Sequence, residues 1–355
     1  MNVAVIMAGG AGTRFWPKST KEKPKQFLKL FGKKSLIQQT VERLDGFIDE
    51  KNVMVITNND YVHLVNQQLP GLEQKYIIGE PLARNTAPCI ASAAALLYNE
   101  NPDAVMVVLP ADHRITDPQR FLEVLQVASK TAREQNSLVT IGIEPNRPET
   151  GYGYIRREAN PDVHFDGQDV YRVKNFTEKP ELARAQDFLK SGDYLWNSGI
   201  FVWKVETIVK AFRQHLPEIF EQMERLAGSD KNEEHINTFY EGCPSISIDY
   251  GIMEKAENVH VVPASFGWND VGSWKAVHEL ADKDENGNAI GDSTVILQEA
   301  SGNLVDASSG KTIALVGVNN IAIVETEDAI LVVNLDQAQG VKQVVDEIDR
   351  LAETE

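Results

Sequence analysis

The first 145 or so residues alternate between short apolar runs rich in β-branched side chains and longer stretches with helical periodicity. Short apolar runs of this kind are typical of strands that are covered on both faces. Repeated strand–helix–strand units predict a parallel sheet with helices on both faces, which binds ligands beyond the carboxyl ends of its strands. The expected strands are Val3–Met7, Val53–Thr57, Ala104–Leu109 and Leu138–Ile143, and the expected helices are Leu36–Leu44, Pro88–Asn99 and Gln119–Gln135.

The remaining sequence predicts the end of this α/β domain and a smaller β domain after it. The polar, turn-rich segment 282–288 predicts a boundary, with one domain over residues 1–285 and the other over 286–355. Before the boundary we expect strands at Tyr154–Arg157, Tyr171–Phe176 and Leu195–Trp203, and helices at Glu181–Ser191 and Val205–Leu216. After it we expect strands at Thr294–Leu297, Thr312–Val316, Ile321–Glu325 and Ala329–Asn334, then an amphipathic helix with Val341, Val344, Val345, Ile348 and Leu351 on one face.

The charge balance restricts the class of ligand. The 355 residues contain 35 Lys and Arg but 52 Asp and Glu, a formal net charge of -17. This balance argues against a nucleic-acid-binding surface but is compatible with a small phosphorylated ligand. Cys89 and Cys243 are too few for a disulfide framework or a cysteine metal site, so we expect both to be buried and reduced. No signal peptide or membrane-spanning run is evident, which predicts a cytoplasmic protein without membrane contact.

A Gly-rich loop, AGGAGTRFWPKSTKEKPKQF at residues 8–27, directly follows the first expected strand. It is not a dinucleotide-binding fingerprint, because Phe15 stands in place of the third glycine, nor a P-loop, because Pro17 replaces the second. Its glycines still let backbone N–H groups approach an anion, and two cations can bind phosphate oxygens. The alternative is a tight turn with solvent-facing charges. The residues expected to bind phosphate here, and nucleotide by the resemblance described next, are Gly9, Gly10, Gly12, Thr13, Arg14 and Lys25.

The loop resembles the signature G-G-x-G-T-R-x-x-P, followed by P-K, of the nucleotide-sugar pyrophosphorylases. Within that family, Trp16-Pro17 and the run PKQF at 24–27 resemble the mannose-1-phosphate guanylyltransferases. Seven further segments match that group in order: GEPLARNTAP (79–88), LPADHRI (109–115), RPETGYGYI (147–155), FTEKP (176–180), LWNSGIF (195–201), SIDYGIMEK (247–255) and FGWNDVGSW (266–274). The resemblance covers residues 1–280 and is weaker beyond them. It implies a Rossmann-like, mixed but mostly parallel sheet.

Two aspartates are the candidate metal ligands. Asp112 follows the third expected strand, and a carboxylate there suits Mg²⁺, which favours one or two carboxylates together with substrate phosphates. The resemblance implies that Asp270 is the second Mg²⁺ ligand. Helix capping for Asp112 and a turn role for Asp270 are the structural alternatives. His113 has no partner at a metal-binding spacing, so we interpret it as structural.

Two further groups of residues are candidate substrate ligands. Arg84, Asn85 and Thr86 precede an expected helix, and the resemblance places nucleobase recognition there; a helix cap is an alternative or additional role. Guanine cannot be distinguished from thymine on these residues alone. The resemblance also implies sugar-phosphate binding by Gly153, Glu178, Lys179 and Asn197, where the alternative is a surface ion pair or an edge turn.

Taken together, the residues and the resemblance predict a Mg²⁺-dependent enzyme in which mannose 1-phosphate attacks GTP, giving GDP-mannose and pyrophosphate. Its expected catalytic residues are Arg14, Lys25, Asp112 and Asp270. No nucleophilic side chain is needed, because in-line attack at phosphorus asks mainly for positioning and charge neutralisation. The same chemistry with another nucleotide or sugar is the first alternative. A non-catalytic regulatory subunit that binds nucleotide sugars is the second.

The resemblance also bears on the C-terminal part. Longer relatives carry a cupin-type phosphomannose-isomerase domain, but the roughly 70 residues after the boundary lack clustered histidines, so we predict no isomerase activity. Shorter relatives carry a left-handed β-helix-like module there and often form homodimers. The sequence supports short strands in this region but shows neither handedness nor dimerisation.

Overall fold

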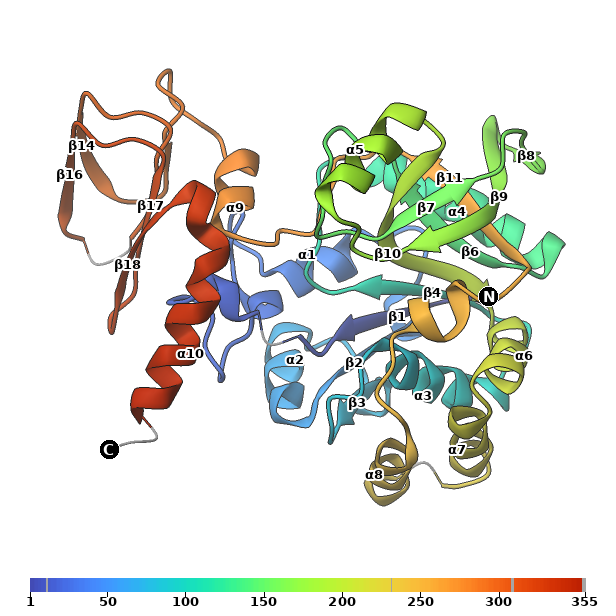
Figure 1. Cartoon of the computed structure of the whole chain (residues 1–355). Coiled ribbons are helices and arrows are strands. Elements are labelled where there is room, and N and C mark those ends of the chain that lie inside the picture. Colours follow the sequence, from blue (N-terminus) through green and yellow to red (C-terminus); the bar gives the residue numbers. More distant parts are fainter. Residues whose placement is uncertain (11, 231, 308–309, 353–355) are drawn as a thin grey trace. The chain divides into compact units, whose positions relative to one another are not determined.

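The computed structural model describes residues 1–10, 12–230, 232–307 and 310–352. The chain forms two compact units (Figure 1). Unit 1 contains Met1–Gly9, Val41–Ala111 and Ile115–Trp268, and unit 2 contains Gly10–Thr40, Asp112–Arg114 and Asn269–Glu355. These units are grouped by contacts rather than by chain order, because the Gly-rich loop belongs with the C-terminal part. The division of the sequence at residue 285 stays a prediction.

Unit 1 is built on one mixed sheet with the order β3-β2-β1-β4-β10-β6-β11-β9-β7, and β8 pairs with β9. The parallel pairs are those within β3-β2-β1-β4 and between β6 and β11, while β10 is antiparallel to both of its neighbours on this path. The strands are β1 (Asn2–Ala8), β2 (Val53–Asn58), β3 (Ile77–Glu80), β4 (Val105–Pro110), β6 (Leu138–Ile143), β7 (Tyr154–Arg157), β8 (Val163–Phe165), β9 (Gln168–Thr177), β10 (Tyr194–Lys204) and β11 (Val259–Ala264).

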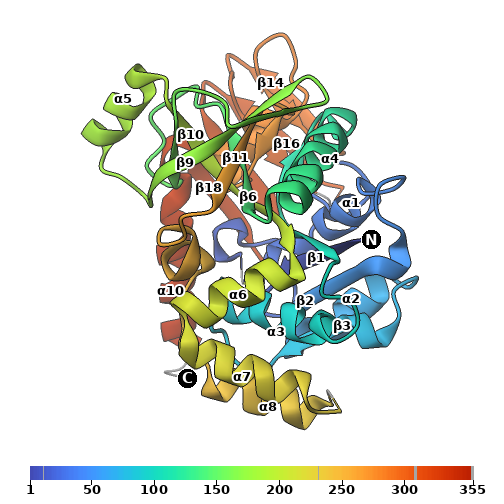
Figure 2. The ribbon, with the colours of Figure 1, turned by 90° about the vertical axis from the view of Figure 1, so that its right-hand side faces the viewer.

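Helices cover both faces of this sheet (Figure 2). The Ala-rich helix α3 is buried from Ala87 to Leu97 and shares a core with alternate residues of β1, β2 and β4. It packs on α6 and α7, whereas α4 packs on β4, β6, β10 and β11. The helices are α2 (Val62–Gln68), α3 (Thr86–Tyr98), α4 (Pro118–Gln135), α5 (Leu182–Ser191), α6 (Val205–His215), α7 (Pro217–Ala227) and α8 (Glu233–Gly242), with short helical turns η3 (Glu50–Asn52), η4 (Asn59–Tyr61), η5 (Gln74–Tyr76) and η6 (Asp249–Met253).

Unit 2 joins the Gly-rich loop to a small β structure and the terminal helix. Parallel pairs β13-β15, β15-β17 and β14-β16 link strands 15 to 18 residues apart in sequence, which is the arrangement of successive coils in a β-helix. The elements are η1 (Thr13–Phe15), η2 (Lys25–Phe27), α9 (Trp274–Leu280), β13 (Ala289–Ile290), β14 (Thr294–Gln298), β15 (Leu304–Asp306), β16 (Thr312–Val316), β17 (Ile321–Glu325), β18 (Ile330–Asn334), η7 (Leu335–Gly340) and α10 (Val341–Ala352). Helix α1 (Leu36–Glu42) and the short strands β5 (Arg114–Ile115) and β12 (Trp268–Asn269) lie where the chain passes from one unit to the other.

Buried asparagines connect the turns of this β structure. Asn303 is fully buried and donates from Nδ2 to Asn288 Oδ1 at 3.1 Å and to the Val318 carbonyl at 3.0 Å. Its own Oδ1 accepts from the Ile321 amide at 3.1 Å. An interior side-chain amide therefore satisfies backbone groups that the short strands leave unpaired.

One apolar core holds unit 2 together. Phe15 and Leu28 of the loop segment share it with Val271 and Trp274 and with Val341 of α10. The Phe15 and Trp274 rings meet edge to face, with centroids 5.3 Å apart. This packing fixes the loop against the C-terminal segment and so positions the polar residues beside Phe15. The rest of the expected apolar face of α10 is less buried, since Val344, Ile348 and Leu351 are exposed.

Candidate active site

A cavity of about 410 Å³ in unit 2 gathers the expected phosphate and metal ligands. Its polar character comes from the loop, from the segment after β4 and from the segment before α9. The lining residues are Gly12, Thr13, Arg14, Phe15, Lys25, Asp112, His113, Asp270, Val271, Gly272 and Lys342. All the expected catalytic residues are therefore at one cavity, although they are far apart in sequence.

The loop needs a glycine where it approaches Lys25. Gly12 has a φ of 62°, in the left-handed region, and a Cβ there would lie 2.4 Å from the Cβ of Lys25. Glycine alone combines this conformation with so close an approach. After it, η1 turns Phe15 into the core and leaves the Arg14 side chain exposed.

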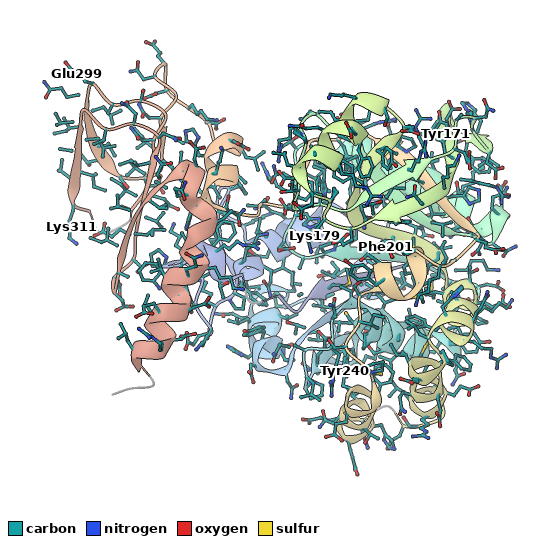
Figure 3. All side chains as sticks on the ribbon, viewed as in Figure 1. Tyr171, Lys179, Phe201, Tyr240, Glu299 and Lys311 are labelled. Atoms are coloured by element: carbon teal, nitrogen blue, oxygen red, sulfur yellow. The ribbon has the colours of Figure 1, made fainter. Side chains whose placement is uncertain are left out.

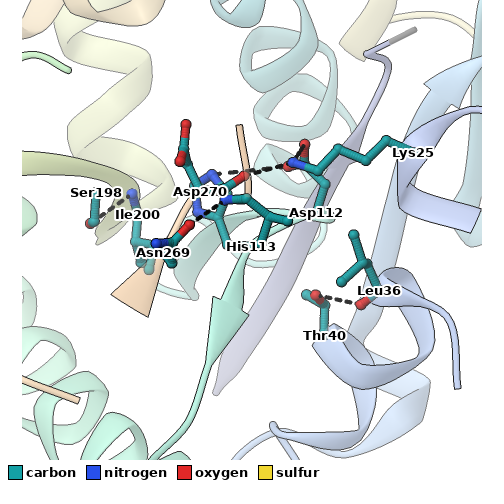
Figure 4. A network of polar contacts seen from close by, with 10 residues as sticks. Lys25, Leu36, Thr40, Asp112, His113, Ser198, Ile200, Asn269 and Asp270 are labelled. Carbon is teal, nitrogen blue, oxygen red and sulfur yellow. Dashed lines mark hydrogen bonds and ion pairs between the residues drawn. The ribbon is translucent and has the colours of Figure 1, made fainter. Parts of the chain in front are cut away.

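Lys25 connects the two candidate metal ligands (Figure 4). The side chain is almost fully buried, and its Nζ donates to Asp112 Oδ2 at 2.8 Å and to the Asp270 carbonyl at 2.6 Å. Lys25 was expected to bind phosphate directly. The structure shows it bound to the backbone of one aspartate and the carboxylate of the other, and phosphate binding by Lys25 stays a prediction.

The charge state of Asp112 follows from these neighbours. Burial acts to raise the pKa of Asp112, but the charges of Lys25 and His113 and the hydrogen bond from Lys25 outweigh it, so the pKa lies below its usual value. The carboxylate is therefore ionised at neutral pH. His113, interpreted from the sequence as structural, lines the same cavity, with Nε2 3.9 Å from Asp112 Oδ1.

The cavity also contains a cation that the sequence did not single out. Lys342 belongs to the first turn of α10, more than three hundred residues after the loop. A lone lysine in a terminal amphipathic helix has no motif around it. Only the tertiary packing of α10 against η1 brings it to this wall.

In unit 1, the expected sugar-phosphate ligands form a second cluster. The backbone N–H of Asn197 donates to the Gly153 carbonyl at 2.8 Å. A Cβ on Gly153 would meet Glu178 Oε2 at 2.4 Å. Glycine at 153 thus makes room for the Glu178 carboxylate. Asn197 Nδ2 donates to Asp249 Oδ1 at 2.7 Å, which adds a second carboxylate to this cluster.

Asp249 is a candidate site residue that the sequence analysis missed. Burial, with the nearby Glu178 carboxylate, raises its pKa to about 6, while the hydrogen bond from Asn197 acts in the opposite direction. Asp249 lies in the segment SIDYGIMEK, which was recognised only as a family match. A half-buried carboxyl group beside another carboxylate and an amide can accept hydrogen bonds from sugar hydroxyls.

Lys179 projects from the edge of the same cluster and is labelled in Figure 3. Its backbone has a φ of 44°, its amide donates to the Tyr152 carbonyl at 3.2 Å, and its Nζ lies 3.2 Å from Glu178 Oε1. About 65% of the side chain is exposed. The exposed ammonium group of Lys179, on a backbone held by this hydrogen bond, can bind a phosphate group.

The candidate nucleobase residues form the start of α3. Asn85 is the N-cap, its Oδ1 accepting from the Thr86 amide at 2.8 Å, so the helix-cap role is present. Thr86 Oγ1 accepts from the Ile248 amide at 2.9 Å, and the Arg84 carbonyl accepts from the Ile246 amide at 3.2 Å. These bonds fix the 84–86 segment to the chain directly before Asp249, within unit 1.

Gly9 lies beside a buried carboxyl group that the sequence analysis also missed. A Cβ on Gly9 would meet Glu80 Oε2 at 2.8 Å, and Glu80 is only 8% exposed. Burial raises the pKa of Glu80 to about 7, although a hydrogen bond from Tyr240 acts to lower it. Gly10 belongs to unit 2 and is exposed.

The donor set is compatible with a metal that takes few protein ligands. Within the described ranges, no group of three or more His, Cys, Asp and Glu side chains could enclose a metal ion. The cavity offers two carboxylates, Asp112 and Asp270. This set fits Mg²⁺, which keeps waters and substrate phosphates as its other ligands, and does not fit a closed structural site.

Residues 3–287 match the family model described as nucleotidyl transferase. The chain belongs to this family. Residues 293–348 match a second model, the MannoseP isomerase/GMP-like beta-helix domain, in agreement with the parallel coils of unit 2. The mixed sheet, the C-terminal β structure and the terminal helix confirm the expected fold class. The sheet is less parallel than expected, because β10 and β9 each run antiparallel to all of the strands with which they pair.

Similar proteins extend over nearly the whole chain. A mannose-1-phosphate guanylyltransferase of Klebsiella pneumoniae is 41% identical over 98% of this chain and 74% of its own length. The alginate biosynthesis protein AlgA of Pseudomonas syringae pv. tomato is 41% identical over 99% of this chain and 73% of its own. A solved Thermus thermophilus structure, described as a mannose-1-phosphate geranyltransferase, superposes with a TM-score of 0.88 at 35% identity, covering 98% and 99% of the two chains.

The described helices include none that is both long enough and apolar enough to cross a membrane. Cys89 and Cys243 are both buried and free, as expected.

Proposed function

We propose that this enzyme transfers GMP from GTP to α-D-mannose 1-phosphate, giving GDP-mannose and pyrophosphate. The observation that carries the proposal is the cavity in which Lys25 joins Asp112 and Asp270 beside the Gly-rich loop. The relatives named mannose-1-phosphate guanylyltransferase, about 40% identical over almost the whole chain, support this choice of substrates.

The reaction needs positioned charge rather than a protein nucleophile. A phosphate oxygen of mannose 1-phosphate forms a bond to the α-phosphorus of GTP, and the bond to the bridging α–β oxygen breaks with its electron pair leaving on pyrophosphate. We assign the triphosphate to Arg14, Lys25 and the loop backbone. Lys25 also keeps Asp112 ionised, so Lys25→Ala should lower kcat through both roles.

A divalent cation completes this assignment. We propose Mg²⁺, held by Asp112 and Asp270; it supplies Lewis-acid neutralisation of phosphate charge when bound. The protein contributes two oxygen ligands and the ammonium group of Lys25, which holds Asp112 in place.

On the acceptor side, we assign the sugar hydroxyls to Glu178, Asn197 and Asp249, and the sugar phosphate to Lys179. Asn197 donates a hydrogen bond to Asp249, and a Cβ on Gly153 would meet both Glu178 and Asn197. We assign the nucleobase to Arg84, Asn85 and Thr86 at the start of α3, where Thr86 Oγ1 accepts a hydrogen bond from the Ile248 amide. A homodimer remains a proposal that rests on family resemblance, and the cytoplasmic location predicted from the sequence remains a proposal as well.

The test is a substrate screen. Purified protein with Mg²⁺ is assayed for pyrophosphate release with four nucleoside triphosphates and several sugar 1-phosphates. GTP with mannose 1-phosphate should be the fastest pair. A preference above about tenfold for dTTP or ATP would refute the guanylyl assignment and leave the reaction class intact. No turnover with any pair, despite GDP-mannose binding, would instead favour the non-catalytic regulatory subunit.

A further inference from the structure

Among the charged residues that line the unit 2 cavity, Lys342 is the one for which neither the family signature nor the proposed reaction has a role. The cavity wall consists of the loop residues Gly12 to Phe15, the two aspartates with Lys25 and His113, and the first turn of α10. Lys342 comes from that first turn and is exposed. Its position needs an explanation because the cavity is the one assigned to the phosphates.

The charge balance at the cavity leaves two cations available. Lys25 is already paired with Asp112. Among the described residues, neither Arg14 nor Lys342 has a carboxylate partner. Four other lysines of unit 2 do have one: Lys18 with Asp306, Lys21 with Asp349, Lys275 with Asp336 and Lys311 with Glu325.

The absence of a local ion pair is informative for a helical lysine. Asp346 is four residues after Lys342 on α10, a spacing at which oppositely charged side chains commonly interact. No ion pair joins them in the described part of α10, and Lys342 lines the cavity instead. Further along the same helix, Arg350 does pair with a helical neighbour, Glu347.

The backbone holds this lysine firmly beside the loop. Val341, the preceding residue, is 1% exposed in the core that contains Phe15, and Phe15 directly follows Arg14. Neighbouring core residues thus place Arg14 and Lys342 on one cavity wall, from two segments of one compact unit. A lysine there provides a compact, mobile charge, complementary to the planar guanidinium group of Arg14.

We propose that Lys342 binds the phosphate chain of the nucleotide, and pyrophosphate as its product, together with Arg14. The C-terminal helix is then part of the substrate-binding machinery as well as of the fold. This inference rests on the proposed function, since it assigns a ligand to the same cavity.

The binding test uses pyrophosphate with Mg²⁺, measured by calorimetry on the full chain. Lys342→Ala should weaken binding about tenfold, Lys342→Glu more strongly, and Lys342→Arg should stay within about threefold of the parent protein. Arg350→Ala is the matched control, because it removes one positive charge from the same helix outside the cavity, and it should bind like the parent. Lys342→Gln serves as a second neutral variant if Lys342→Ala has a lowered melting temperature.

The kinetic test uses the substrate pair that the screen identifies. Lys342→Ala should raise the KM for the nucleotide about tenfold while the KM for the sugar 1-phosphate stays unchanged. Equal pyrophosphate affinity and equal nucleotide KM in Lys342→Ala and Arg350→Ala would overturn the inference. Failure of this inference can be distinguished from failure of the proposed function. An inactive parent protein that still binds pyrophosphate through Lys342 contradicts the proposed function only.

Discussion

Glu80 provides a quantitative test of how burial of a carboxyl group affects its pKa and the stability of unit 1. The side chain is 8% exposed, and in the described chain it has a hydrogen bond from Tyr240 but no cationic partner. Burial raises its pKa from 4.5 to about 7. Each pKa unit is worth roughly 1.4 kcal/mol, so ionising this group in the folded state costs about 3 kcal/mol relative to the unfolded chain.

The sign of the pH dependence follows directly. Because the folded state has the higher pKa, it binds the proton more tightly, and this contribution to stability is fully present below pH 4.5. It is lost as the pH rises from 4.5 to about 7 and does not change further above that. Glu80→Gln has nearly the same shape and no charge to desolvate, so it should stabilise unit 1 by about 3 kcal/mol at pH 8 and by almost nothing at pH 4.5.

The assay must report on unit 1 alone, and the buried amides of α3 do so. Amide hydrogen exchange of residues 87–97 should be on the order of 100-fold slower in Glu80→Gln than in the parent at pH 8, and equal at pH 4.5. Comparing the two proteins at one pH cancels the intrinsic exchange rate. Glu134→Gln, at an exposed position of α4, is the control and should match the parent at both pH values. A Glu80→Gln protein with the parent's exchange rates at pH 8 refutes the reasoning.

Three further predictions concern activity. Asp112→Asn and Asp270→Asn should each lower turnover on the order of 100-fold or more with a nearly unchanged thermal melt, and wild-type turnover in either would remove that residue from the metal site. Lys179→Ala should mainly raise the KM for mannose 1-phosphate, with partial rescue in Lys179→Arg; a selective loss of GTP affinity would contradict the assignment. Burial raises the pKa of Asp249 to about 6, so affinity for mannose 1-phosphate should fall as the parent is taken below pH 6, and this change should be absent from the pH profile of Asp249→Asn.

Most of unit 1 could be predicted because its signals are local. The expected strands and helices are present, with ends displaced by up to three residues. The sequence analysis missed strands β3, β8 and β11 and helices α2, α7 and α8. Pro217 is at the first helical position of α7, so the proline that marks the end of α6 also begins a new helix.

The candidate site residues were missed for a different reason, which they share. Asp249 lies in a short π-helical turn, Glu80 at the end of β3, and Lys342 in the terminal helix, so none belongs to a motif with a known spacing. Each becomes informative through a partner distant in sequence: Asn197, Gly9 and the loop at Arg14. Sequence patterns report on neighbours along a helix or strand, and these contacts are made only when the chain has folded.

Unit 2 combines segments from both ends of the chain, which affects how the protein folds during its synthesis. Phe15 and Leu28 leave the ribosome early, but Val271, the first of their later core partners, is synthesised 243 residues after Leu28. At a synthesis rate of roughly 5–20 residues per second, these apolar side chains wait about 12–50 s without the core that will cover them. The loop that lines the unit 2 cavity therefore leaves the ribosome well before the residues that cover Phe15 and Leu28, and these side chains need protection from aggregation until then.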